Sequence, residues 1–104
     1  MPLQDQIAEL LRLPEDGAGA PTLATVESTL TDGYAHALAL EAERWRIERR
    51  LGEVARDAGG AGMARELATL SERLETADGE LAKLRALLQR LQVKARALRA
   101  LRTA

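Results

Sequence analysis

The side chains with the greatest chemical potential in this sequence are one histidine and a C-terminal run of basic residues. His36 is the only histidine, and the chain has no cysteine. Asp32 lies about one helical turn before His36, yet no second histidine or Glu-x-x-His pattern accompanies the pair. Catalytic and metal sites need several converging groups. We therefore expect His36 to be solvated, and we predict no enzyme activity, no metal, no cofactor and no small-molecule substrate.

The basic run lies at the C-terminal end and has two interpretations. Residues 81–104 contain no acid, whereas the first 80 residues carry all 16 acids of the chain. The run is either a solvated face neutralised by these acids, or a surface that binds phosphates of nucleic acid or of an anionic membrane. No aromatic residue interleaves the bases, so binding to nucleic acid would be independent of sequence. The candidate anion-binding residues are Lys83, Arg85, Arg90, Lys94, Arg96, Arg99 and Arg102.

The composition predicts one small helical domain. The chain has 104 residues, of which 46% are apolar, and its only aromatic residues are Tyr34 and Trp45. Leucine, alanine, arginine and glutamate dominate, as in long helices and coiled coils. The absence of cysteine fits a reducing compartment. The N-terminal residues do not resemble a secretory signal, and no apolar run approaches the roughly 20 residues that span a bilayer. We expect a cytoplasmic protein.

Breaks in the pattern divide the chain into two parts. Residues 1–21 comprise a short amphipathic helix, over residues 3–13, and a linker rich in proline and glycine. Residues 22–104 form two long helical segments, at about 22–58 and 62–102, with Thr22 as the N-cap of the first. The glycines of the bend at 59–62 separate the two segments.

A seven-residue repeat runs through both long segments and predicts one apolar seam on each. The repeat continues through Asp32-Gly33 and Asp78-Gly79, so we expect both helices to be continuous there. The first seam comprises Leu23, Val26, Leu30, Gly33, Ala37, Leu40, Arg44, Ile47, Leu51, Val54 and Ala58. The second comprises Met63, Leu67, Leu70, Leu74, Ala77, Leu81, Leu84, Leu88, Leu91, Ala95 and Leu98.

The bend brings these two seams face to face if the chain reverses at Gly60–Ala61. Small residues then lie opposite large ones, as close packing requires. Gly33 faces Leu88, for example, and Arg44 faces Ala77. Gly59 suits the left-handed residue that follows a helix, and short loops favour antiparallel neighbours. The predicted fold is all-α, an antiparallel coiled-coil helical hairpin with a short N-terminal helix.

Charges beside the seams support this register on one flank only. On that flank Glu27 lies within reach of Arg99, and Glu41 within reach of Arg85. On the other flank like charges meet, because Arg50 falls near Arg73 and Glu43 near Glu80. Exposed pairs contribute only about 0–1 kcal/mol each, so the flanks are secondary evidence.

Apolar residues outside the seams predict an interaction surface. A core of two helices is thin, so we expect further burial against a second copy of the chain, as in most soluble oligomers. Two alternatives to a second copy are a helical segment of another protein and an apolar ligand stacked on Trp45. The expected function is a non-enzymatic coiled-coil protein-interaction module that forms a homodimer, of the kind found in adaptors and chaperones. The candidate interface residues are Tyr34, Leu38, Ala42, Trp45, Leu87 and Leu101.

The N-terminal helix is too short to be stable alone, because isolated helices below roughly 12–15 residues are marginal. We expect it to dock beside residues 84–101, of its own chain or of a second copy. Its apolar face would cover Leu87 and Leu101, and its acids, Asp5 and Glu9, would face the arginines there.

Overall fold

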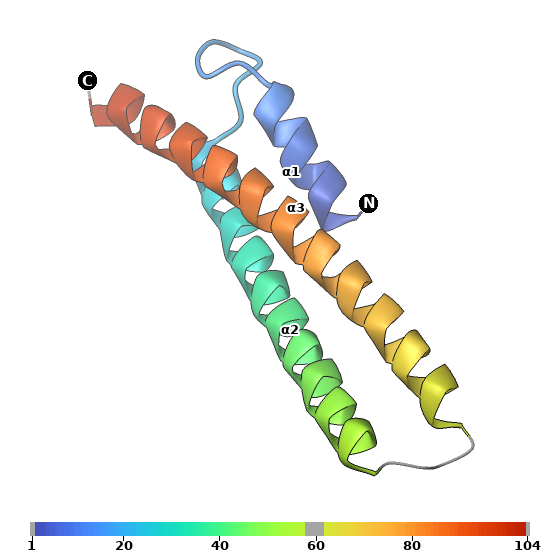
Figure 1. The fold of residues 1–104 in the computed structure, drawn as a ribbon. Helices are drawn as coiled ribbons and strands as arrows, with labels where there is room; N and C mark the ends of the chain where they lie inside the picture. Colours follow the sequence, from blue (N-terminus) through green and yellow to red (C-terminus); the bar gives the residue numbers. More distant parts are fainter. Residues whose placement is uncertain (1, 58–61, 104) are drawn as a thin grey trace. The chain divides into compact units, whose positions relative to one another are not determined.

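A computed structural model describes residues 2–57 and 62–103, and the described chain is all-helical (Figure 1). Helix α1 spans Leu3–Arg12, α2 spans Leu23–Arg56 and α3 spans Met63–Thr103. These bounds confirm the predicted helices and their continuity through both Asp-Gly pairs. The bend at Gly59 and Gly60, and the seam position of Ala58, lie outside the described residues.

The chain divides into two compact units. The first combines Met1–Ala37 with Lys83–Ala104, and the second comprises Leu38–Ala82. In each unit a stretch of α2 packs against a stretch of α3 that runs in the opposite direction. The fold class predicted from the sequence, an all-α helical hairpin with a short N-terminal helix, is confirmed.

The core of the second unit consists of the predicted seam residues. Ile47, Val54 and Leu70 are buried together, with partly buried seam residues packed around them: Leu51, Met63, Leu67 and Leu74. Ala77 and Leu81 continue the buried seam along α3. Side chains that recur every three or four residues share one side of a helix, which explains why the sequence alone identified them.

Arg44 faces α3 at its seam position but, unlike the residues above, is not buried in the core. Its side chain is exposed, and its guanidinium bonds Asp78 of α3, with Nε 2.8 Å from Oδ1. Nε also lies 3.3 Å from Oε1 of Glu48. A long arginine stem allows the charged group to reach water from a position near the core, which avoids the cost of burying it.

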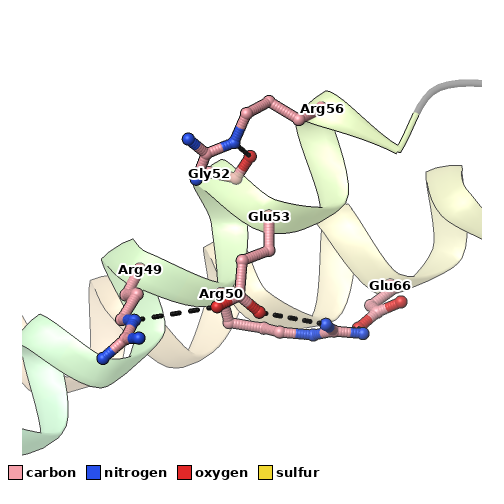
Figure 2. Close-up of polar contacts among 6 residues, drawn as sticks. All are labelled: Arg49, Arg50, Gly52, Glu53, Arg56 and Glu66. Carbon is pink, nitrogen blue, oxygen red and sulfur yellow. Dashed lines mark hydrogen bonds and ion pairs between the residues drawn. The ribbon is translucent and has the colours of Figure 1, made fainter.

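On the flank where like charges were expected to meet, two ion pairs join α2 to α3. Arg50 bonds Glu66, with Nη2 2.7 Å from Oε1 (Figure 2). Arg73 bonds Glu43 at the same distance of 2.7 Å. The expected approach of Arg50 to Arg73 was therefore wrong as a pairing. Each of these two α2 side chains bonds a residue of α3 that lies five positions N-terminal to the residue directly opposite. At that offset the charges of the two helices are complementary.

These contacts change the pKa of two groups in opposite directions. Hydrogen bonds from Arg46 and Arg73 lower the pKa of the Glu43 carboxyl. Hydrogen bonds to Glu66 and Glu53 raise the pKa of Arg50. A carboxyl with a depressed pKa in the folded state stabilises the fold above its unfolded pKa, and this contribution is lost as pH falls through the folded pKa. Arg50 is exposed and Glu43 is partly exposed, so their effect on stability is small.

Replacing Arg73 with glutamine should raise the pKa of Glu43 toward its ordinary value, because one hydrogen-bond donor to the carboxylate is lost. Arg46→Gln should raise it further, since Arg46 makes the larger contribution. Carboxyl carbon shifts measured by NMR across the acidic range would follow this titration. Arg65→Gln, a substitution elsewhere on α3, serves as the control. A Glu43 pKa that is equal in all four proteins would contradict the ion pair.

In the first unit α2 approaches α3 closely at a glycine. Val26, Leu30 and Ala37 of α2 are buried, as are five predicted seam residues of α3: Leu84, Leu88, Leu91, Ala95 and Leu98. Gly33 is buried against Leu88, whose Cγ lies 3.4 Å from the position that a Cβ atom at Gly33 would take. The predicted facing of glycine and leucine is confirmed. Glu27 bonds Arg99 at 3.3 Å, which confirms that predicted flanking pair.

The segment between α1 and α2 ends in the predicted N-cap. The Thr22 hydroxyl accepts a hydrogen bond from the backbone N–H of Thr25 at 3.1 Å, which satisfies a free donor of the first turn. Gly17 has a φ of 83°, a conformation that favours glycine, and its carbonyl accepts a bond from the N–H of Ala20. The helix break predicted from the prolines and glycines is thus a structured turn.

Helix α1 docks beside α3 of its own chain, and Lys94 holds its C-terminal end. Ile7 of α1 is fully buried. The Lys94 ammonium donates hydrogen bonds to the carbonyl oxygens of Leu10, at 2.6 Å, of Leu11, at 3.4 Å, and of Leu13. A cation stabilises the negative end of a helix and satisfies carbonyls that lack partners within it. The predicted docking against residues 84–101 is confirmed.

The expected details of this docking were partly wrong. Leu101 is 50% exposed, so α1 does not cover it. Glu9 bonds Arg12 of its own helix at 3.2 Å instead of an arginine of α3. The charged contact that joins the two helices is therefore the opposite of the expected one. Lys94 of α3 interacts with the negative, C-terminal end of the α1 dipole, whereas the expected contact joined acids of α1 to arginines of α3.

Candidate functional site

The second unit presents an apolar surface on the side of α2 opposite its seam. Leu38 is 66% exposed and Trp45 is 59% exposed, with exposed Ala42 between them. At about 100° per residue, these positions point away from Leu40 and Ile47, which face α3. We call Leu38, Ala42 and Trp45 the outer face of α2. Large apolar side chains at this exposure are the feature that a binding surface requires.

Arg49 borders the outer face and was missed in the sequence. Its guanidinium lies 5.4 Å from the centroid of the Trp45 ring, one helical turn earlier, in a cation–π arrangement. Arg49 also pairs with Glu53, with Nε 3.7 Å from Oε1. The spacing of four residues between Trp45 and Arg49 is the available signal in the sequence, because such side chains are neighbours on a helix.

The other predicted interface residues lie in the first unit. Tyr34 and Leu101 are exposed, whereas Leu87 is only partly exposed. The structure adds Val93 on α3, which is 57% exposed and was not predicted. Its signal in the sequence is a β-branched apolar residue outside the seam of α3. The three residues of the outer face, in contrast, share one side of α2 within the second unit.

The seven candidate anion-binding residues do not form one surface. Lys94 is only 6% exposed and its ammonium binds three carbonyls, so its assignment as an anion site was wrong. By helical geometry Lys83 and Arg90 lie within about 40° of Lys94, on the side of α1. Arg99 points instead toward Glu27 of α2, and two further bases share its side of α3: Arg85 and Arg96.

Acidic residues lie near the basic end of α3, as the first interpretation of the charge pattern expects. Arg102 lines a solvent-open groove together with Glu15 and Asp16. Arg90 lines a second groove, which Glu15 also borders. A phosphate approaching either groove meets a carboxylate as well as a guanidinium. The arrangement therefore favours a solvated, partly neutralised face over an anion site.

The side chains that could hold a metal ion are dispersed in the described residues. His36 is exposed, as predicted. Among residues 2–57 and 62–103, no group of three or more histidine, aspartate or glutamate side chains is arranged to hold a metal ion. In the same ranges, no helix combines the length and apolar character needed to cross a bilayer.

Comparison with known proteins identifies no relative: no family model, no curated protein and no solved structure matches this chain.

Proposed function

We propose that this protein is a non-enzymatic coiled-coil interaction module that forms a homodimer through the outer face of α2. The observation that carries the proposal is the exposure of Leu38 and Trp45 on the side of α2 that α3 does not cover. Tryptophan is among the residues most often responsible for binding energy at protein interfaces. The dimer would act as an adaptor, and the cytoplasmic setting expected from the composition belongs to the same proposal.

The surroundings of the outer face support a protein partner over a small apolar ligand. A ligand site is normally a concave pocket that covers most of the ligand. Leu38, Ala42 and Trp45 line none of four solvent-open grooves found elsewhere in the described residues. A second helix, in contrast, requires only a stripe of apolar side chains with room for close approach, which Ala42 provides.

Replacing Trp45 with glutamate should weaken self-association at least about tenfold, because a buried tryptophan at an interface contributes about 2 kcal/mol or more. Light scattering over a range of concentrations would measure the effect. Trp45 is the only tryptophan, so its emission in the unmutated protein should also shift to longer wavelength as dilution separates the dimer. Leu38→Glu should act in the same direction.

Val93→Glu is the matched control, since it places the same charge at an equally exposed apolar residue of α3. The proposal requires this variant to remain a dimer. A stable monomer at micromolar concentration would refute homodimer formation. A dimer that Val93→Glu dissociates and Trp45→Glu leaves intact would place the interface elsewhere.

A further inference from the structure

Helix α1 covers a surface of the first unit that has the properties of a binding site. We call this surface, with Lys94 of α3 at one end, the α1 site. We propose that the α1 site also binds a short helix of a partner protein when α1 is released, so that α1 acts as a displaceable strap. The site lies within the first unit and does not involve the outer face of α2, so the proposal goes beyond the function proposed above.

Lys94 recognises the way in which α1 ends. Proline has no N–H, so Pro14 cannot donate to the carbonyl of Leu10 four residues earlier, as another helical residue would. A residue before proline is also confined to extended conformations, and Leu13 accordingly has φ −72° and ψ 148°. The Leu13 carbonyl leaves the helix and meets the Lys94 ammonium, which also bonds the Leu10 carbonyl at 2.6 Å. The recognised feature is therefore a helix that stops before a proline.

Away from Lys94, α1 contributes an apolar side chain to the interior of the first unit. Ile7 is fully buried, as are Val26 of α2 and Leu91 of α3 in the same unit. Lys94 is buried too, and an enclosed charge must be paired with hydrogen-bond acceptors. Release of α1 removes three carbonyl acceptors from Lys94 and the cover from an apolar surface. The C-terminal end of an amphipathic helix replaces both, because it carries free carbonyls and a partial negative charge.

Helix α1 is marginal on its own and is joined to α2 by an exposed segment. It has 10 residues, fewer than the roughly 12–15 that an isolated helix needs, and Pro2 at its N-cap makes no side-chain hydrogen bond. Residues 14–19 of the following segment are all exposed. Lys94 and Leu13 also line a solvent-open groove, so water reaches the contact that ends α1. No seam residue belongs to α1, so its release leaves the pairing of α2 with α3 in place.

The tether decides which kind of helix gains from binding. Residues 13–22 hold α1 near its site at an effective concentration on the order of millimolar. A helix in solution must displace α1, so its apparent affinity is lowered by the fraction of the protein that is open. The α1 of a second copy already has such a site of its own, and exchange gains it no contact. The expected occupant is therefore a helix of another protein, with an apolar residue and a proline at the spacing of Ile7 and Pro14.

A peptide of residues 1–16, amidated at its C-terminus and labelled at its N-terminus, is the probe, and fluorescence anisotropy measures its binding to the full chain. Ile7→Asp in the full chain releases α1 but leaves the α1 site intact, because the changed side chain belongs to the strap. This variant should bind the probe at least about tenfold more tightly than the unmutated protein, because a site that is open about a tenth of the time loses that factor. Ala8→Gly, which lowers only the helix propensity of α1, should act in the same direction by a few-fold.

Substitutions at the helix end test what the site recognises. Adding Lys94→Met to Ile7→Asp should weaken probe binding about tenfold or more, because hydrogen bonds to a charged group are lost. Lys83→Met is the matched control and should leave binding unchanged, since Lys83 is exposed on nearly the same side of α3. A probe with Pro14→Ala should bind several-fold more weakly, because the alanine N–H takes the Leu10 carbonyl from Lys94. This penalty should disappear in the protein with Lys94→Met.

Contrary results would identify the step that fails. If neither Ile7→Asp nor Ala8→Gly improves probe binding, while circular dichroism shows both to be helical, the α1 site accepts no helix in trans. Equal binding with and without Lys94 would remove the recognition of the helix end. Trp45→Glu prevents the proposed dimer, so Trp45→Glu chains with and without Ile7→Asp should stay monomeric when mixed. A mixed dimer in light scattering would make a second copy the occupant and overturn the assignment to another protein. The proposed homodimer is tested separately, because the probe does not bind the outer face.

Discussion

Lys94→Met should lower the free energy of unfolding by roughly 1.5–3 kcal/mol or more, the range for a hydrogen bond to a charged group. The substitution keeps an unbranched side chain but removes the ammonium that bonds the carbonyls of Leu10, Leu11 and Leu13. These groups end α1, and without Lys94 they lose their cationic partner. Chemical denaturation measures the loss. Hydrogen exchange should show reduced protection within residues 3–12.

Lys83→Met is the control, because Lys83 is an exposed lysine on nearly the same side of α3 and should cost little. A second test deletes residues 1–20 and with them the carbonyls that Lys94 binds. The deletion should itself destabilise the protein, since Ile7 is fully buried. In the shortened chain Lys94→Met should no longer be destabilising. An equal cost in both backgrounds would show that Lys94 does not act through α1.

Gly33→Leu should cost about 1–3 kcal/mol or more, the usual range for adding side-chain volume to a packed core. Any Cβ at this position overlaps the Cδ2 methyl of Leu88, which is itself buried. Leucine has a higher helix propensity than glycine by roughly 0.8–1 kcal/mol, so the loss would occur despite a local gain. Denaturant titration of the variant and the unmutated protein measures the difference.

Gly79→Leu provides the comparison in the same Asp-Gly context. A Cβ at Gly79 meets nothing within 4 Å, so this variant should be unchanged or more stable by up to about 0.8–1 kcal/mol. Combining Gly33→Leu with Leu88→Ala should recover part of the loss, because the new side chain fills the space that Leu88 leaves. Strictly additive costs of the two changes would mean that the residues do not share a packing site.

The outer face could be predicted only as a set of residues. Leu38, Ala42 and Trp45 were identified because they repeat at helical spacing outside the seam, and the structure leaves all three exposed. What covers them is a separate question, because a stripe of apolar residues fits several kinds of helical partner equally well.

The repeat in the sequence alone determined which residues form the seams and that the chain reverses between them. Side-chain direction in a helix follows from position, so a regular spacing assigns each residue to a side without any tertiary information. The pairing of Gly33 with Leu88 followed from the same spacing once the chain was folded back. Thr22 as an N-cap was equally local, because its hydroxyl bonds a residue three positions away.

Only the tertiary structure decided which partners the charged side chains select. Lys94 appeared in the sequence as one of seven bases, yet it is buried at the end of α1, which is distant in the chain. Arg50 and Glu43 were assigned like-charged neighbours, and both pair instead with complementary residues nearer the N-terminus of α3. Long side chains reach several positions, so spacing along one helix leaves their partners undetermined. The three-dimensional approach of a second helix selects among them.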